Sequence, residues 1–403
     1  MEEVINLDNT KIAFANKSNK ELRKSKILFN LLSKVWILEI AKPITAFLLR
    51  IHFPIEYLLK YTVFDQFCGG ETIEECKSTV NNLHEIGGVN SILDYSVEGK
   101  NEEHFFEDTL ETMLRISVYA KYSEAVPFLV FKPTGLGRSE IYEKVSLNAE
   151  LTEMELKEWQ TIRERYDVIC RVIAATDDLK IMIDAEESWM QKAIDNLAEE
   201  MMLKYNKDRT VVFTTLQMYR WDRLSYLEYL YSLGKQNGIK IGVKFVRGAY
   251  MEKEREMADL NGYESPICPD KASTDLNFNN AVSYSLNRLE VYELFLGTHN
   301  ELSCQILMNG MLEKSIENND NRIWFGQLYG MSDHISYNLA VNDYNTSKYV
   351  PFGALREVIP YLFRRAEENT SIGNQTTREL TLINTEIKRR KESKVFSKRK
   401  NRK

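Results

Sequence analysis

Eight short apolar segments, separated by stretches with helical periodicity, constrain the fold of this chain most strongly. Short buried strands alternating with helices are typical of parallel pairing with right-handed crossovers. The expected strands are Asn90–Tyr95, Phe128–Pro133, Lys180–Ala185, Thr210–Leu216, Lys240–Gly248, Tyr292–Thr298, Ile323–Tyr329 and Lys348–Phe352. Eight such units predict an α/β fold, a (β/α)8 barrel of the TIM type, with an open doubly wound sheet as the alternative.

The regions outside these strands divide the chain into three parts. Residues 1–85 read as helices with short breaks and form an N-terminal helical arm. Residues 86–375 contain the eight strands and form the barrel. Residues 376–403 are polar and basic, and we expect them to be disordered. No G-x-G-x-x-G motif follows an early strand, which disfavours a dinucleotide-binding Rossmann domain.

Composition excludes several classes of protein. A formal net charge of −6 argues against a general nucleic-acid binder. The five cysteines are scattered, without a C-x-x-C pair, and the five histidines include no H-x-x-x-H pair, so we expect neither a disulfide framework nor a metal site. There is no run of 18 apolar residues, and the acidic, polar start resembles neither a secretory signal nor a transit peptide. These features predict a cytoplasmic protein.

Polar side chains end nearly every expected strand. In a barrel of this type the carboxyl ends of the strands form one face, and reactive groups gather there. The residues concerned are Lys132, Asp184, Gln217, Arg247, Tyr250, Thr298, His299, Asn300, Gln327, Tyr329 and Tyr349. One such residue is explained by packing, but a polar residue at most strand ends predicts a binding or catalytic site.

The helix expected after the last strand carries paired arginines. Its polar side contains Tyr361, Arg364, Arg365 and Glu368, at helical spacing. A guanidinium group binds a carboxylate through two parallel hydrogen bonds, so this side suits a small ligand with a carboxylate and an apolar body. A solvated helix face is the alternative interpretation.

Seven segments in this order resemble the proline dehydrogenase family, and the resemblance extends from about Val89 to Ser371. They are Phe131–Thr134 (FKPT), Asp184–Glu187 (DAEE), Thr215–Tyr219 (TLQMY), Lys244–Tyr250 (KFVRGAY), Gly297–Asn300 (GTHN), Gln327–Met331 (QLYGM) and Tyr349–Asn369. The resemblance implies a distorted barrel with non-covalent FAD, which oxidises L-proline to Δ1-pyrroline-5-carboxylate by hydride transfer to flavin N5 and passes electrons to a membrane quinone.

The order of two basic residues, Lys244 and Arg247, is that of the mitochondrial-type members; in bifunctional bacterial members the two are exchanged. The chain ends soon after the barrel, so we expect a monofunctional enzyme that catalyses the first step of proline catabolism. A separate pyrroline-5-carboxylate dehydrogenase would then be its functional partner.

The resemblance also implies roles for individual residues. Arg364 and Arg365 would bind the substrate carboxylate, and Tyr349, Tyr361 and Leu328 would form the wall around the ring. Lys132 and Asp184 would lie close to the reacting centre. Tyr349 leaves little room for a 4-hydroxyl group, which favours proline over 4-hydroxyproline. The implied FAD-binding residues are Gln217, Lys244, Val246, Arg247, Gly248, Thr298, His299, Asn300, Glu368 and Ser371.

Several alternatives stay open at this point. His299 taken alone is typical of a satisfied core histidine, and Gln327 of a residue that caps a strand end. Another barrel flavoenzyme, resembling methylenetetrahydrofolate reductase, and a non-catalytic binding module are the competing functions. The basic run Lys388–Lys403 fits peripheral contact with an anionic membrane, on the inner membrane or its matrix side in a eukaryote, or a solubilising tail.

Overall fold

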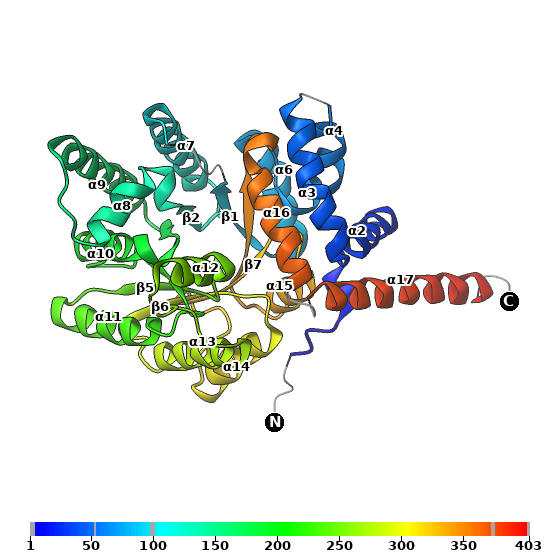
Figure 1. Ribbon diagram of the computed structural model, residues 1–403. Helices are drawn as coiled ribbons and strands as arrows, with labels where there is room; N and C mark the ends of the chain where they lie inside the picture. The colour runs from blue at the N-terminus through cyan, green and yellow to red at the C-terminus, as the bar shows by residue number, and fades with distance from the viewer. Residues whose placement is uncertain (1–4, 52–53, 97–100, 372–374, 401–403) are drawn as a thin grey trace.

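Eight parallel strands form a closed barrel. The computed structural model describes residues 5–51, 54–96, 101–371 and 375–400 (Figure 1). The strands pair in chain order, and β1 pairs with β8 from Asn90–Ser347 to Tyr95–Phe352 to close the barrel. They are β1 (Asn90–Tyr95), β2 (Phe128–Phe131), β3 (Lys180–Ile183), β4 (Val212–Gln217), β5 (Ile241–Val246), β6 (Tyr292–Gly297), β7 (Ile323–Leu328) and β8 (Thr346–Phe352). All eight predicted strands are confirmed, and the open sheet is excluded.

Helices precede, alternate with and follow the strands. Before the barrel lie α1 (Thr10–Ala13), α2 (Asn19–Leu32), α3 (Val35–Arg50), α4 (Glu56–Leu59), the π-helical turn η1 (Lys60–Phe64), α5 (Asp65–Phe67) and α6 (Ile73–Gly87). Between strands lie α7 (Glu103–Lys121), the 3-10 turn η2 (Pro133–Gly135), α8 (Ser139–Ser146), α9 (Glu153–Ala174), α10 (Ser188–Tyr205), α11 (Arg223–Asn237), α12 (Met251–Asn261), α13 (Lys271–Leu286), α14 (Glu301–Glu313) and α15 (Asp333–Ala340). After β8 come α16 (Leu355–Ser371) and α17 (Gln375–Lys400). None of the helices in these ranges is long and apolar enough to cross a bilayer.

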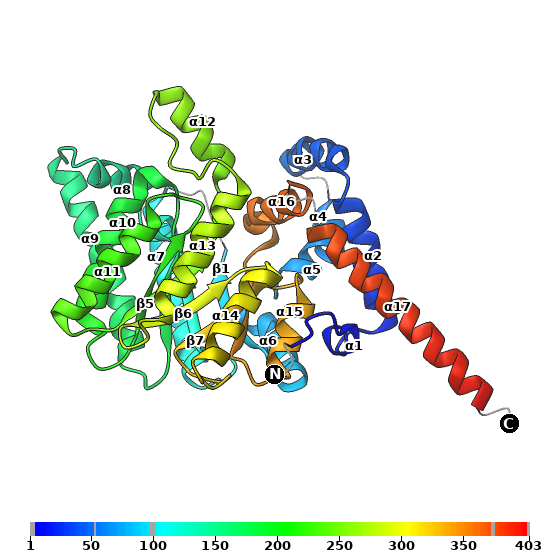
Figure 2. The ribbon, with the colours of Figure 1, turned by 90° about the horizontal axis from the view of Figure 1, so that it is seen from below.

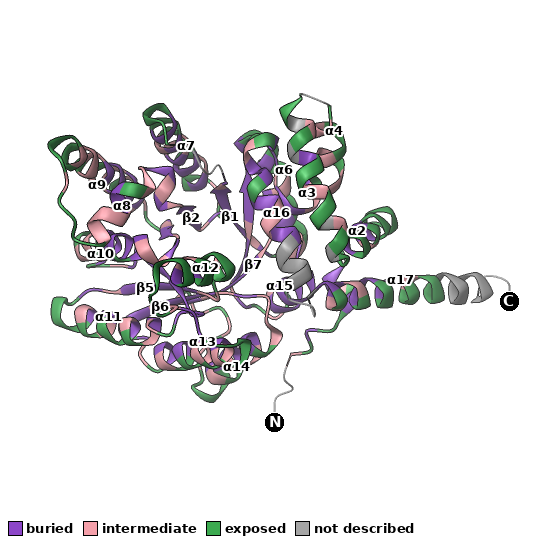
Figure 3. Ribbon diagram, viewed as in Figure 1, coloured by how far each residue is buried: buried purple, intermediate pink, exposed green. Residues whose placement is uncertain are grey.

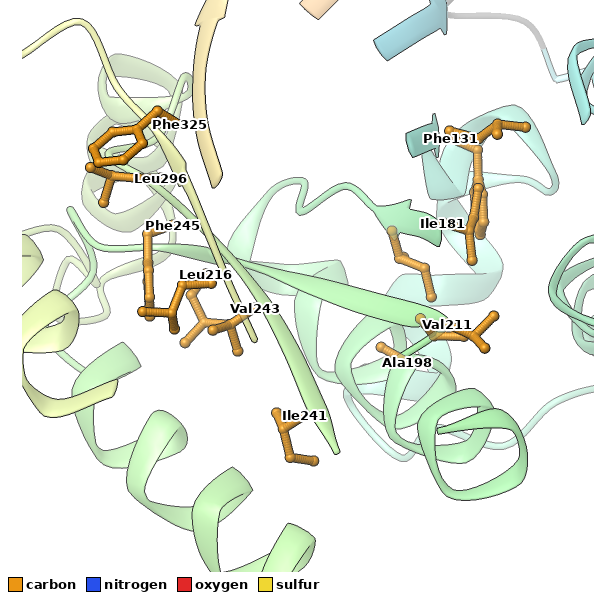
Figure 4. Close-up of a cluster of buried hydrophobic side chains, with 14 of the residues drawn as sticks. Phe131, Ile181, Ala198, Val211, Leu216, Ile241, Val243, Phe245, Leu296 and Phe325 are labelled. Atoms are coloured by element: carbon orange, nitrogen blue, oxygen red, sulfur yellow. The ribbon is translucent and has the colours of Figure 1, made fainter. Parts of the chain in front are cut away.

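Side chains alternate between the two faces of each strand, because successive residues of a strand point to opposite sides. The outward set packs under the surrounding helices, and Figure 4 shows part of it, including Val243 and Phe245 of β5. The inward set is aromatic at the amino end of the barrel. There the Phe128 ring centroid lies 5.5 Å from that of Phe213, 5.4 Å from that of Phe295 and 5.1 Å from that of Trp324. These rings fill the lower interior, so ligand chemistry is confined to the carboxyl end.

A second hydrophobic cluster joins the N-terminal helices to the helices after β8. It includes Phe29 of α2, Phe67 of α5 and Val358 of α16, all buried. Helix α16 contacts α2 and α3, and α17 contacts α2, as Figure 2 shows from below. Leu328, at the end of β7, packs against the same cluster. The cluster therefore holds α16 beside the carboxyl end of the barrel.

The prediction that residues 376–403 are disordered is wrong for the described part of that segment. Residues Gln375–Lys400 form helix α17. Leu382 and Ile383 are buried in the second cluster, and Glu386 is fully buried. Arg389 and Arg390 pair with the Glu386 carboxylate at 2.7 Å and 2.6 Å. Because most residues of this segment are charged or polar, its sequence did not reveal the buried pair Leu382 and Ile383 or the ion pairs of Glu386. These contacts hold the first half of the helix in place.

Gly330 supplies a close contact that ties the N-terminal region to the end of β7. Its φ is +77°, and a Cβ added there would lie 1.8 Å from the Gln66 carbonyl oxygen. The Gln66 side-chain amide donates to the Gly330 carbonyl oxygen at 2.7 Å.

We predict that Gly330→Ala lowers the free energy of unfolding by several kcal/mol, because the left-handed backbone costs about 1–2 kcal/mol and the clash adds to it. Gly262→Ala is the matched control, since Gly262 has a φ of +68° and no atom near its added Cβ. Thermal and urea denaturation measure both. Equal losses for the two variants would contradict the close contact.

Candidate functional site

Charged and polar side chains from several strands meet inside the carboxyl end of the barrel. They lie on the inward-facing side of the strands, above the rings of Phe128, Phe213, Phe295 and Trp324, which we call the aromatic plug. The group consists of Asp94 of β1, Lys132 after β2, Asp184 after β3, Lys244 of β5 and Tyr349 of β8. We call it the mouth cluster. A surface hollow lined by Met308, Asn318 and Tyr344 lies at the opposite, amino end of β7 and β8 and is not part of it.

Asp184 is the centre of the mouth cluster. The Tyr349 hydroxyl donates to its Oδ2 at 2.9 Å, Lys244 pairs with its Oδ1, and Lys132 Nζ lies 4.0 Å from Oδ2. Burial alone would raise the pKa of Asp184, but Lys244 and Lys132 outweigh it and hold the pKa below its usual range. The carboxylate is therefore charged. Burial, together with Asp184 and Asp94, raises the pKa of Tyr349, so its phenol stays a neutral donor.

Asp94 is a member that sequence reasoning missed. Its two carboxylate oxygens each lie 3.1 Å from Lys132 Nζ, and it also accepts a hydrogen bond from Ser96. Two lysines thus face two aspartates in a closed space, which balances the buried charge. The sequence did contain a signal for Asp94, because an aspartate near the end of an apolar strand is as unusual as the lysine after β2.

His299 forms a second, partly buried polar contact, after β6. Its Nδ1 lies 2.8 Å from Ser332 Oγ in the turn after β7. Burial, with the nearby charges of Lys348 and Arg365, lowers the pKa of His299 to about 3. The imidazole is therefore neutral at physiological pH. The charge of Arg365, on α16, is therefore among those that act on His299.

The turn that carries Ser332 is held from three directions. Asp333 pairs with Lys17, ahead of α2, at 2.7 Å and with Lys348 of β8 at 3.0 Å. The Ser332 backbone N–H donates to the Glu379 carboxylate of α17 at 2.6 Å. The N-terminal arm, the barrel and the C-terminal helix all fix this turn. The sequence carried no sign of it, because the partners are remote in the chain.

The residues predicted to bind substrate fall into two groups. Tyr349 belongs to the mouth cluster. Tyr361 and Leu328 pack in the second hydrophobic cluster, and the buried Arg365 has its guanidinium carbon 5.0 Å from the Tyr361 ring centroid. Arg364 is half-buried on the same helix. The structure thus brings Arg365, Tyr361 and Leu328 together.

Among the residues predicted to bind a cofactor, Gln217 has the environment that best fits a bound group. It is buried at the inward-facing end of β4, and its side-chain oxygen Oε1 has no hydrogen-bond partner among the described residues. An unsatisfied buried amide oxygen is costly and points to a missing donor. Lys244 lies in the mouth cluster, and Val246 ends β5 on its inward side.

Other predicted cofactor residues have structural partners. Arg247 donates to Asp275 at 2.8 Å and to Thr298 Oγ1 at 2.7 Å. Asn300 caps α14, since its side chain accepts from a backbone N–H at 3.1 Å. Gly248 has a φ of +130°, and an added Cβ would lie 2.5 Å from the Tyr219 ring, so packing already requires a glycine there.

Three further residues complete the comparison with the sequence. Gln327 donates to the Thr298 carbonyl oxygen at 3.1 Å and accepts from Ser336 at 2.6 Å, which fits its interpretation as a residue that caps a strand end. Glu368 and Ser371 belong to α16, but their side chains lie outside the described part of the structure. Their role in cofactor binding stays a prediction.

Comparisons of the sequence with known proteins agree with the barrel fold and identify the family. A sequence model described as "Proline dehydrogenase" matches residues 76–378. The chain belongs to the proline dehydrogenase family. Carbapenem antibiotics biosynthesis protein CarD of Pectobacterium carotovorum subsp. carotovorum is 36% identical, over 80% of this chain and 83% of that protein. Proline dehydrogenase 1, mitochondrial, of Dictyostelium discoideum is 31% identical over 84% of this chain and 66% of that protein.

A solved structure agrees with the barrel. Proline utilization A from Bdellovibrio bacteriovorus matches 90% of this proline dehydrogenase family chain with a TM-score of 0.68 and 17% sequence identity. The chain spans only 36% of that protein, so the likeness concerns the fold.

The lowered pKa of the half-buried His299 predicts a loss of stability in mild acid. Its pKa of about 3 lies below the ordinary value of 6.5, so the unfolded chain takes up a proton that the folded chain refuses. The free energy of unfolding should fall as the pH drops below 6.5, by about 2 kcal/mol between pH 7 and pH 5. His299→Asn should flatten this slope, and the exposed His104→Asn should leave it unchanged. Urea titrations at both pH values measure it; a slope unchanged in His299→Asn would contradict the assignment.

Proposed function

We propose that this chain catalyses the FAD-dependent oxidation of L-proline to Δ1-pyrroline-5-carboxylate, the first step of proline catabolism. The observation that carries the proposal is the charged carboxylate of the half-buried Asp184, which Lys132, Lys244 and Tyr349 surround at the carboxyl end of the barrel. Barrels of this type place their reactive groups at that end. The fold and the family membership support the same activity.

The chain offers groups that fit an isoalloxazine ring. The unpartnered Gln217 oxygen would accept a hydrogen bond from a ring N–H, and Lys244 would place positive charge beside the ring. Bound FAD would supply the acceptor for the hydride that leaves the substrate carbon next to nitrogen. The full set proposed to hold FAD is Gln217, Lys244, Val246, Arg247, Gly248, Thr298, His299, Asn300, Glu368 and Ser371.

The substrate carboxylate is assigned to the arginines of α16. Arg365 is buried and its charge acts on His299, and Arg364 is its neighbour on the same helix. Tyr361 and Leu328 would contact the apolar ring from one side, and Tyr349 from the other. Because the Tyr349 hydroxyl already donates to Asp184, its position is fixed, and the space it fills is closed to a 4-hydroxyl group. L-proline is therefore the proposed substrate in preference to 4-hydroxyproline.

The mouth cluster would position the substrate amine. A secondary amine must be neutral to release a hydride from its neighbouring carbon. Lys132 and Lys244 offset the negative charge of Asp184, so the site does not favour a protonated amine as strongly as a lone carboxylate would. Lys132 and Asp184 are thus the residues assigned to the reacting centre, where they orient the substrate and set the local charge.

The wider setting is also part of the proposal. The electron acceptor would be a quinone, and a separate pyrroline-5-carboxylate dehydrogenase would use the product. A cytoplasmic location with peripheral contact to the inner membrane, on the matrix side in a eukaryote, would bring the enzyme to that quinone.

Two other functions remain as competitors. A folate-binding barrel flavoenzyme would bind flavin but would not be reduced by proline. A non-catalytic barrel would bind no flavin at all. The flavin content of the purified protein and its response to proline separate the three.

Arg365→Met and Arg364→Met should each raise KM for L-proline by about 10- to 100-fold, because a charge-assisted hydrogen bond to the carboxylate is lost. Flavin content should not change. Arg356→Met is the control, since Arg356 lies on the same helix and pairs with Glu56 at 2.5 Å near the surface. Steady-state kinetics measure the effect. An unaltered KM in both Arg364 and Arg365 variants would remove the carboxylate assignment.

A further inference from the structure

Helix α3 exposes a continuous apolar face. Its members recur at intervals of three and four residues, which places them on one side of the helix. They are Trp36, Ile40, Ile44 and Phe47, followed by Ile51 just after the helix. Trp36 is 59% exposed and Phe47 is 61% exposed. Figure 3 shows the exposed residues along this helix.

The opposite side of α3 already has partners. The helix contacts α2 and α16, and Thr45 on that side is buried. The exposed apolar side of α3 faces away from these contacts, so no element in the described part of the chain is packed over it. The exposed side therefore requires a partner that the isolated chain does not supply.

The next helical segment extends this surface. Tyr57 and Leu58 of α4 and Tyr61 of η1 are all exposed, and the Tyr57 and Tyr61 ring centroids are 4.5 Å apart. Figures 1 and 2 show α4 beside α3. We define the α3–α4 surface as Trp36, Ile40, Ile44, Phe47, Ile51, Tyr57, Leu58 and Tyr61. It combines tryptophan and tyrosine with aliphatic residues, a composition typical of the boundary between water and a bilayer.

The net charge of the region around this surface indicates the chemical class of its partner. Residues 19–50 contain seven basic side chains and two acidic ones, a net charge of +5, whereas the whole chain has a net charge of −6. The basic residues are Lys20, Arg23, Lys24, Lys26, Lys34, Lys42 and Arg50, and the acidic ones are Glu21 and Glu39. An anionic partner would be attracted. A second copy of the chain, meeting this surface with its own, would bring two positive regions together.

We propose that the α3–α4 surface binds an anionic lipid bilayer, with α3 lying in the plane of the headgroups. The apolar side chains would enter the boundary between headgroups and acyl chains, and basic residues of this region would lie among the headgroups, except Lys42, which lies over the Phe363 ring of α16. This places membrane contact on the N-terminal arm instead of the basic run Lys388–Lys403. The proposal does not depend on the reaction assigned to the barrel, and vesicle binding is measured without any activity assay.

Flotation with vesicles of phosphatidylcholine, with and without phosphatidylglycerol, tests the proposal on the full chain. Wild type should float with the anionic vesicles, and less so at high salt. The double variant Ile44→Ser/Phe47→Ser should bind about a hundredfold more weakly, because two large apolar side chains no longer enter the bilayer. Leu147→Ser/Leu260→Ser is the matched control, since both leucines are exposed elsewhere, at the end of α8 and in α12. It should bind like wild type.

A variant of the C-terminal run, Lys398→Gln/Arg399→Gln/Lys400→Gln, separates the two basic regions. The proposal expects it to bind within a few-fold of wild type. Loss of flotation in this variant, together with full binding by Ile44→Ser/Phe47→Ser, would overturn the proposal. So would failure of wild type to float with anionic vesicles. A dimer in sedimentation velocity that the surface variant abolishes, without vesicle binding by wild type, would assign the surface to self-association instead.

Discussion

The ion pairs and the hydrogen bond of the half-buried Asp184 carboxylate are the interactions on which the site depends. A charge in a closed interior is costly unless other charges and hydrogen bonds compensate it. Here the compensation comes from three other strands or strand ends, through Lys132, Lys244 and Tyr349. Only a closed barrel brings those positions within contact distance. The aromatic plug below prevents water from reaching the group from the amino end, so the cluster faces the carboxyl mouth alone.

Segments outside the eight strands complete this arrangement. Asp333 links the turn after β7 to Lys17 and Lys348, and Glu379 of α17 holds the neighbouring backbone. His299 is hydrogen-bonded to Ser332 of the same turn. The second hydrophobic cluster places α16, with its arginines, beside that region. The two ends of the chain therefore contribute to the geometry of the site, although neither belongs to the barrel.

Patterns within a short window were predictable, whereas partners distant in the chain were not. Each apolar run marked its own strand, and the polar residue after it marked the carboxyl end, so Lys132, Asp184 and Tyr349 were expected near one another. The alternation of side chains along a strand would also have distinguished the roles of two glutamines. Gln217 faces the barrel interior, whereas Gln327 forms hydrogen bonds with Thr298 and Ser336. The pairing of Lys17 with Asp333 depends on tertiary packing alone. The helical fold of α17 was concealed because Leu382, Ile383 and Glu386 are few among many charges.

The central claim is that the mouth cluster and the α16 arginines serve oxidation of proline by a bound flavin. Anaerobic titration of the flavin-loaded protein with L-proline, and in parallel with 4-hydroxy-L-proline, tests it most directly. The account predicts that L-proline bleaches the visible absorbance of the oxidised flavin and that 4-hydroxyproline does so only at much higher concentration. A flavin that binds but keeps its oxidised spectrum in excess L-proline would contradict it.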